Sequence, residues 1–133
     1  MKKQIVFLTM LFITIALAFT QVEDRVFCII LVSGSELSGV TAEFRDFNSN
    51  GRLRFRVRNR LRNEDIEILS VEVIGKNARG DEIRRTFSAS DIEMEDDYDG
   101  IIPHRSERIT IYIRRLTLFR SISGIIIYTD FIG

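Results

Sequence analysis

Residues 52–62 read RLRFRVRNRLR, with an arginine at every second position and four apolar residues and one asparagine between them. In an extended strand successive side chains point to opposite faces, so this alternation predicts a strand with one apolar face and one basic face. The segment therefore predicts a half-buried strand.

The dipeptide Asn50-Gly51 directly precedes this strand and is preferred in tight hairpins, because both residues tolerate positive φ. The preceding residues are then expected to form the partner strand. Widening the loop from two residues to four shifts the pairing by two but keeps the same faces together, so the core is predicted to contain Val40, Ala42, Phe44, Phe55 and Val57 under either loop. With a two-residue loop, the expected cross-strand pairs are Phe44 with Val57, Val40 with Leu61, Glu43 with Arg58, and Arg45 with Arg56.

Strand-like periodicity continues along the chain from Val26. In residues 66–74 the apolar positions change from even to odd near Leu69-Ser70, which indicates a bulge or a strand that changes sheets. The run Ile125–Tyr128 is apolar on both faces, as in an interior strand. About seven strands result, at turn spacings typical of an antiparallel immunoglobulin-like β-sandwich; beyond the two hairpin strands they are 26–32, 66–74, 81–89 (after a turn at 77–80), 108–114 and the C-terminal run.

The first residues have the features of an export signal. Two lysines precede the apolar run 5–19, and Ala16-Leu17-Ala18 supplies a small-x-small cleavage site. We therefore expect a signal peptide at 1–18 and a domain at 23–133. The alternatives are an uncleaved membrane anchor extending to about residue 22, and a pilin-type cut before Gln4 that leaves the run as an assembly helix. Each places the domain outside the cytoplasm, as a secreted, periplasmic, cell-surface or membrane-anchored protein.

The composition excludes several classes of function. Nineteen basic and nineteen acidic residues give zero net charge, which argues against bulk nucleic-acid affinity. One histidine and one cysteine exclude a Cys/His zinc site and an internal disulfide, so no cofactor is expected. Cys28 is predicted to be a buried free thiol. His104 has no acid/base partner or nucleophile motif near it in the sequence, and the chain is predicted not to be an enzyme.

The order of segments over residues 51–132 resembles the FxLYD-type and related immunoglobulin-like modules of exported prokaryotic proteins. The segments that carry the resemblance are Arg56–Asn59, Ile66–Val73, Asn77–Ile83 and Ile102–Ile109. In place of the Phe-x-Leu-Tyr-Asp motif this chain has residues 73–77, VIGKN, and His104 stands where a glycine is usual. The resemblance implies a non-catalytic adhesion or scaffold module without a shared active site.

The arginine row is the main candidate binding site. Its six members could track a polyanion such as an acidic polysaccharide, a teichoic-type polymer, lipid head groups or nucleic acid; they are Arg52, Arg54, Arg56, Arg58, Arg60 and Arg62. The alternative, favoured by the zero net charge, is that cross-strand carboxylates neutralise the row. The candidates for that role are Glu43, Glu64, Asp65, Glu67, Glu72, Asp91, Glu93 and Glu95.

Two acidic loops are candidate calcium sites. The loop 46–51 begins like a calcium-binding loop, but its twelfth position is Val57 within the strand. Glu95, Asp97 and Asp99 alternate in a second loop, with Ser106 where a bidentate glutamate would be required. The second loop is the weak calcium candidate, and a solvated loop is the expected alternative.

These observations predict a non-catalytic exported module that acts in binding or assembly at the cell envelope or surface. The alternatives are a pilin-like filament subunit or membrane-anchored accessory protein that retains its N-terminal helix, and a polyanion-binding protein. The expected partners are other envelope or surface proteins, including further copies paired through the C-terminal strand or through residues 27–32. Nucleic acid is not expected, and contact with a membrane would come only through an uncleaved N-terminal segment.

Overall fold

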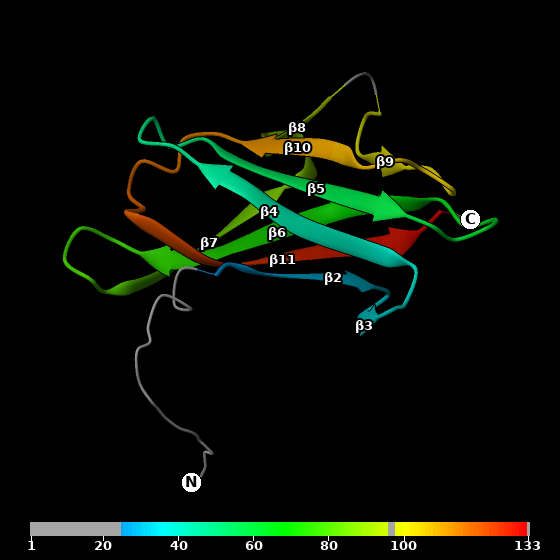
Figure 1. Ribbon diagram of the computed structural model, residues 1–133, viewed down its shortest axis with the longest axis horizontal. Coiled ribbons are helices and arrows are strands. Elements are labelled where there is room, and N and C mark those ends of the chain that lie inside the picture. The colour runs from blue at the N-terminus through cyan, green and yellow to red at the C-terminus, as the bar shows by residue number, and fades with distance from the viewer. Residues whose placement is uncertain (1–24, 96–97, 133) are drawn as a thin grey trace, which may run out of the picture.

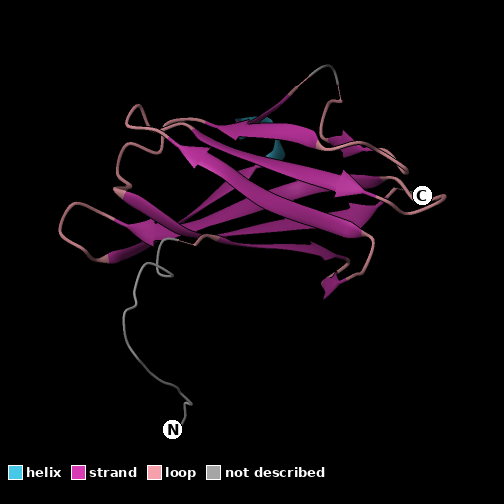
Figure 2. Cartoon of the chain, in the orientation of Figure 1, coloured by secondary structure: helices cyan, strands magenta, loops and turns pink. Residues whose placement is uncertain are grey.

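The computed structural model describes residues 25–95 and 98–132, and these residues form an all-β fold of two sheets (Figures 1 and 2). A single 3₁₀ turn, η3 (Ala89–Asp91), is the one helical element among them. Within these ranges no helix is long and apolar enough to cross a bilayer. The predicted signal or anchor segment lies outside the described residues. The strands are β2 (Phe27–Val32), β3 (Ser35–Glu36), β4 (Val40–Phe47), β5 (Leu53–Asn59), β6 (Ile66–Lys76), β7 (Glu82–Ser88), β8 (Ile92–Met94), β9 (Ile101–Ile102), β10 (Ile109–Ile113) and β11 (Ser121–Phe131).

The strands form one four-stranded sheet, in the order β4-β5-β10-β8, and one larger sheet, in the order β3-β2-β11-β6-β7 with β9 paired to β6. The two layers enclose a common apolar core, in which Phe55 and Ile111 of the first sheet join Val71 and Ile127 of the second. This arrangement is compatible with a β-sandwich. All seven predicted strands are present, and β3, β8 and β9 are short additions.

Strand β5 has the predicted two faces. Leu53, Phe55 and Val57 are fully buried, while the arginines between them are half-buried on the outer side. The strand is shorter than the alternation suggests because it ends at Asn59, whose side-chain oxygen accepts a hydrogen bond from the Leu61 backbone N–H at 2.9 Å. That bond turns the chain away from the sheet, as asparagine commonly does at strand ends.

The β4–β5 hairpin confirms the predicted core face and corrects the predicted pairs. Phe44 lies opposite Phe55 and Glu43 lies opposite Arg56, so the two-residue-loop register was wrong by two positions. The turn is longer because Asn48 closes it, donating its N–H to the Arg52 carbonyl at 3.1 Å and accepting from Gly51 N–H at 3.0 Å. A register shift between Phe44 and Asp46 leaves Arg45 without a partner on β5, which marks a bulge.

The predicted bulge in β6 is confirmed. The pairing of β6 with β11 shifts between Ser70 and Ile68, so that Leu69 is left over and exposed. Strand β11 is interior, as its two apolar faces predicted, and lies between β2 and β6.

The prediction of an entirely antiparallel fold is wrong for β2. Residues Phe27–Val32 pair in parallel with Gly124–Thr129, at the far end of the chain. A parallel neighbour needs a long crossover connection rather than a hairpin. Since nearly the whole domain forms that connection, no turn signal in the sequence could reveal the pairing.

Candidate functional site

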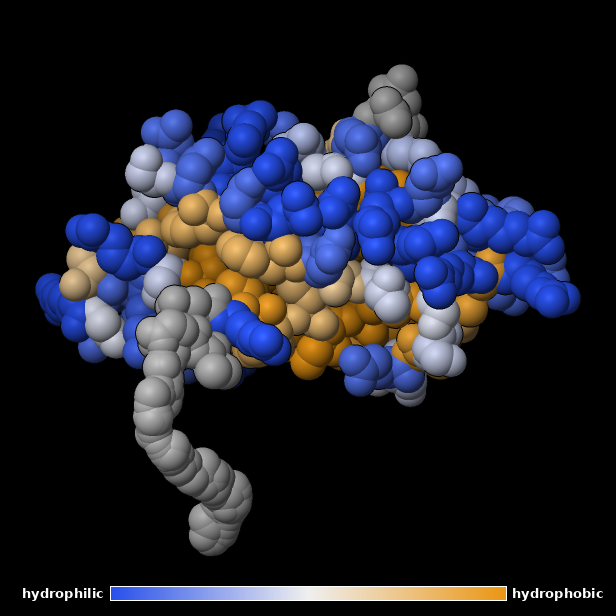
Figure 3. All heavy atoms as spheres, viewed as in Figure 1, coloured by the Kyte–Doolittle hydropathy of each residue, from blue (hydrophilic) through white to orange (hydrophobic). Residues whose placement is uncertain are grey.

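The outer face of the four-stranded sheet carries the arginine row. Strand β5 places Arg54, Arg56 and Arg58 on this face, and Arg52 lies just before the strand. Alternate residues on a strand are about 6.6–6.8 Å apart, so these four side chains span about 20 Å. Figure 3 shows hydrophilic residues gathered over β4 on this layer of the molecule.

The arginine stems lie against the sheet and not freely in solvent. The Nε atoms of Arg52, Arg54, Arg56 and Arg58 are all covered by neighbouring atoms and have no hydrogen-bond partner. The guanidinium carbon of Arg52 lies 5.3 Å from the centre of the Tyr112 ring, a cation–π contact from the adjacent strand β10. The exposed parts of these side chains are therefore their terminal Nη groups, held in an ordered row.

Two carboxylates on β4 neutralise part of the row. Asp46 bonds to Arg54 and raises the pKa of that guanidinium above its ordinary value, chiefly through this hydrogen bond. Glu43 lies 3.0 Å from Arg56 and 3.7 Å from Arg108. Glu43 was among the predicted partners, but Asp46 was not.

The other predicted neutralising residues that have a described partner do not pair with the row. Asp65 and Glu72 belong to or precede β6, in the opposite sheet, where their partners are His104 and Arg84. Glu93 on β8 bonds to Arg114 at 2.9 Å, and Glu95 accepts a hydrogen bond from the Thr110 backbone. Within residues 25–95 and 98–132, the row members that form no ion pair are Arg52, Arg58, Arg60 and Arg62.

The face keeps an excess of positive charge. Six arginines line it or its margins, against four carboxylates, which leaves a formal charge of +2; the arginines are 52, 54, 56, 58, 108 and 114, and the carboxylates are 43, 46, 93 and 95. Arg56, Arg58 and Arg108 converge on a hollow of about 200 Å³, whose rim also includes Glu43. The sequence does not reveal that Arg108 belongs to this surface, because no sequence pattern indicates that β10 pairs with β5.

Arg60 and Arg62 do not continue the row. Both are exposed and follow the end of β5, where the Arg60 N–H donates to the Gly39 carbonyl at 2.6 Å. The candidate surface is therefore the four arginines from 52 to 58 together with Arg108 and Arg114. We call this surface the arginine face.

The calcium candidate is only partly described. Asp97 lies outside the described residues, and Asp99 is exposed with φ +60°. One oxygen of Glu95 is engaged by the Thr110 N–H at 2.5 Å. Among the residues that the structure describes, no group of three or more His, Cys, Asp or Glu is placed to hold a metal ion.

His104 has a partner that the sequence did not reveal. Its Nδ1 lies 2.5 Å from Asp65 Oδ1, and its backbone N–H donates to the same oxygen at 2.8 Å. These two hydrogen bonds hold the pKa of Asp65 below its usual value. The pair ties the turn after β9 to the start of β6. Asp65 lies 39 positions earlier in the chain, which is why sequence spacing gave no sign of it.

Cys28 is half-buried on the inner side of β2, opposite Ile125, and burial raises the pKa of its thiol to about 11. At pH 8 about 0.1% of such a thiol is ionised, against about 24% for an ordinary cysteine with a pKa near 8.5. The greater nucleophilicity of a more basic thiolate recovers about tenfold of this difference. We expect alkylation by iodoacetamide at pH 8 to be about 20-fold slower than that of free cysteine, with a rate that still rises above pH 10. A rate that levels off near pH 9 would contradict this environment for Cys28.

No known protein family, curated protein or solved structure matches this chain.

Proposed function

We propose that this chain is a non-catalytic binding module, exported to the cell envelope or surface, whose arginine face binds an acidic polymer. The observation that carries the proposal is the incomplete neutralisation of the row. Asp46 and Glu43 hold Arg54 and Arg56, whereas Arg52 and Arg58 form no ion pair among the described residues. A regular series of anionic groups could engage these free guanidinium ends without unfolding the sheet.

The spacing and stiffness of the row support a polymer as the ligand. The stems are packed and Arg52 is held against Tyr112, so the side chains have already lost much of their rotamer freedom. Less conformational entropy is then lost on binding. An immunoglobulin-like topology, as the resemblance implies, and an N-terminal export signal are parts of the same proposal.

The direct test replaces Arg54, Arg56 and Arg58 together with glutamine. We expect affinity for heparin, used as a model polyanion, to fall about tenfold, since exposed ion pairs contribute about 0.2–1 kcal/mol each and 1.4 kcal/mol is tenfold. Isothermal titration calorimetry measures the change. The matched control replaces Arg25, Arg79 and Arg120, which are exposed and outside the arginine face, and removes the same charge.

A second variant tests whether removal of the neutralising carboxylates raises the affinity for heparin. Replacing Glu43 with Gln and Asp46 with Asn releases Arg56 and Arg54 from their partners. Affinity for heparin should then rise above that of the unmodified protein. Equal losses in the two triple variants, or no heparin binding by the unmodified protein, would remove the proposal.

A second candidate function is assembly through a sheet edge, and β2 provides the observation that favours it. Strand β3 pairs only with Leu31 and Val32, so residues 27–30 have a strand partner on one side only. Beside this strand a hollow of about 390 Å³ is lined partly by Val26, Phe44 and Ile122. Figure 3 shows a hydrophobic band between β4 and β2 on this side of the molecule. The C-terminal strand β11 is paired on both sides, and assembly through it would require displacement of β2 or β6.

N-terminal sequencing of the purified protein distinguishes a cleaved signal peptide from a retained membrane anchor and from a pilin-type assembly helix. A start at Phe19 is expected for a cleaved signal peptide and would eliminate the retained-anchor and filament-helix versions. A start at Gln4 would instead eliminate the simple secreted form.

A further inference from the structure

Two turns meet at the end of the four-stranded sheet where β5 begins and β10 ends. The Leu116 N–H donates to the Gly51 carbonyl at 2.9 Å, which fastens the segment after β10 to the β4–β5 turn. Gly51 has φ +80°, and a Cβ there would lie 2.9 Å from the Thr117 nitrogen. Only glycine permits both this backbone conformation and so close an approach. The two turns are therefore held together as one unit.

The β4–β5 turn is also fixed internally. The side-chain oxygen of Asn48 accepts hydrogen bonds from the backbone N–H groups of Asn50, at 3.0 Å, and Arg52, at 3.1 Å. Residues at this end of the sheet are thus positioned by backbone hydrogen bonds before any ligand arrives.

These two turns surround an open hollow of about 480 Å³, which we call the end hollow. Its lining contains three arginines, two asparagines and a threonine, and no carboxylate; the residues are Asn48, Asn50, Arg52, Arg114, Arg115 and Thr117. Every one of these side chains can donate hydrogen bonds, and the arginines cannot accept any. The hollow is a concentration of donors and positive charge.

The three arginines are held to different degrees. Arg52 lies over Tyr112, and Arg114 bonds to Glu93 at 2.9 Å, which offsets one charge and leaves a balance of +2. Arg115 has φ +70°, a left-handed conformation that is uncommon for a residue with a Cβ, and it forms no ion pair with any described residue.

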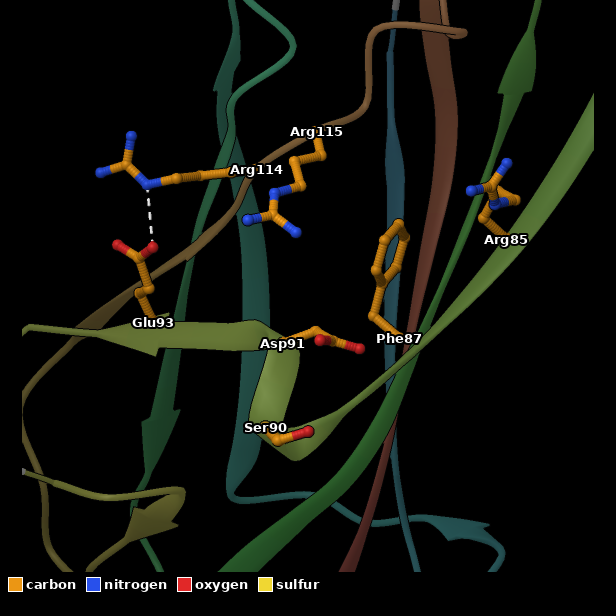
Figure 4. Close-up of a pocket in the computed structure, with 7 residues that line it drawn as sticks. All are labelled: Arg85, Phe87, Ser90, Asp91, Glu93, Arg114 and Arg115. Atoms are coloured by element: carbon orange, nitrogen blue, oxygen red, sulfur yellow. Dashed lines mark hydrogen bonds and ion pairs between the residues drawn. The ribbon is translucent and has the colours of Figure 1, made fainter.

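Arg115 lies between the end hollow and a second hollow. Figure 4 shows it beside this second hollow, of about 370 Å³, on the side of Asp91 and Phe87, with Arg85 across that hollow and Arg114 turned away toward Glu93. Arg114 and Arg115 line both hollows. The second hollow contains two carboxylates, so the end hollow is the more strongly positive of the two.

We propose that the end hollow binds a single doubly charged oxyanion, a phosphate or sulfate group. Planar guanidinium groups pair with two oxygens of such a group at once, and a lining with three arginines and no carboxylate favours a compact, multiply charged anion over a monovalent carboxylate. This site goes beyond the proposed function, because it recognises one group and does not need the rest of the row. The group could be the terminus of an acidic polymer that continues along the arginine face, or a free ion.

The test is a titration with inorganic phosphate at low ionic strength, followed by the amide NMR signals of the purified protein. We expect saturable shifts confined to residues 48–52 and 114–117. Arg115→Asn should weaken binding about tenfold, and asparagine tolerates the left-handed backbone, so the turn should keep its shape. Arg52→Gln should weaken binding similarly. Arg79→Gln removes the same charge from a distant turn and should leave the affinity unchanged.

A parallel titration with tripolyphosphate distinguishes the two sources of the group. A polymer terminus predicts that Arg54→Gln, at the row position next to Arg52, weakens the binding of tripolyphosphate but not of phosphate; a free-ion site predicts no effect of Arg54→Gln on either ligand. In both cases the site requires Arg115. Non-saturable shifts across the surface, or equal effects of Arg115→Asn and Arg79→Gln, would overturn the proposal. The two sites are separable by experiment: phosphate binding that does not depend on Arg115, together with heparin affinity that still falls in the Arg54, Arg56 and Arg58 variant, would leave the proposed function intact and remove the end hollow alone.

Discussion

Replacing Gly75 with alanine is expected to destabilise the protein by about 3 kcal/mol or more, the upper end of the usual cost of overpacking. Gly75 is buried in β6, and a Cβ there would lie 2.1 Å from the Ser121 carbonyl oxygen and 2.8 Å from the Phe119 ring. The oxygen belongs to the backbone of β11, where the pairing with β6 shifts between Ile122 and Gly124. The clash can be relieved only by moving one strand away from the other.

Gly124→Ala is the matched control. Its Cβ would also meet an atom at 2.1 Å, but that atom belongs to the Phe27 ring, which is 46% exposed and can turn outward. We expect a loss below about 1.5 kcal/mol, since a surface side chain adjusts more cheaply than a sheet backbone. Urea denaturation measures both variants. Equal losses, or a Gly75 variant within about 0.5 kcal/mol of the unmodified protein, would contradict this packing of β6 against β11.

Replacing Asn59 with aspartate is the second large expected effect, a loss of about 3 kcal/mol or more at neutral pH. Asn59 is fully buried, and its side-chain nitrogen donates to the carbonyls of Glu64 at 2.8 Å and Ile102 at 3.2 Å. Its backbone exchanges hydrogen bonds with Ser106 at 2.9 and 2.8 Å. A carboxylate of the same shape would place a buried negative charge against two carbonyl oxygens.

The pH dependence of this variant has a definite sign. Two facing carbonyls and burial raise the pKa of a carboxyl at position 59 above its unfolded value. The destabilisation should therefore be small below about pH 4 and should grow as the pH rises above that value. Asn63→Asp, at an exposed position nearby, is the control and should cost less than about 0.5 kcal/mol. The buried hydrogen bonds of Asn59 would be contradicted if the variant's loss of unfolding free energy did not depend on pH. A loss no larger than that of the control would contradict them as well.

The fold was predictable from the sequence to the extent that local periodicity records it. The alternation through Phe55 and Val57 identified a buried face correctly, and the parity change in β6 located a bulge at Leu69. Pairings between distant segments could not be found in this way. The parallel contact of β2 with β11 joins the two ends of the domain, and alternation carries no information about which strand lies alongside which.

Local periodicity also predicted only part of the candidate site. Alternation placed Arg54, Arg56 and Arg58 on one face, but it also included Arg60 and Arg62, because it cannot show that the hydrogen bonds of Asn59 end the strand. The carboxylates Glu67 and Glu72, candidates for neutralising the row, lie on β6 in the opposite sheet.

The end hollow escaped notice for a related reason. Its arginines come from two turns more than sixty positions apart, and the contact between Gly51 and Leu116 brings them together. The Asn50-Gly51 dipeptide predicts the hairpin turn, but it carries no sign of the contact that Gly51 makes with Leu116.

The most direct test of the arginine face is the salt dependence of heparin binding by the unmodified protein and by the variant with glutamine at 54, 56 and 58. For polyelectrolytes, log K falls linearly with log salt concentration, with a slope of about −0.7 to −0.9 for each charge neutralised. We predict a linear plot for the unmodified protein and a slope shallower by about 2 to 3 in the variant. Two parallel lines would show that these arginines do not contact the polymer, which would contradict polymer binding by the arginine face.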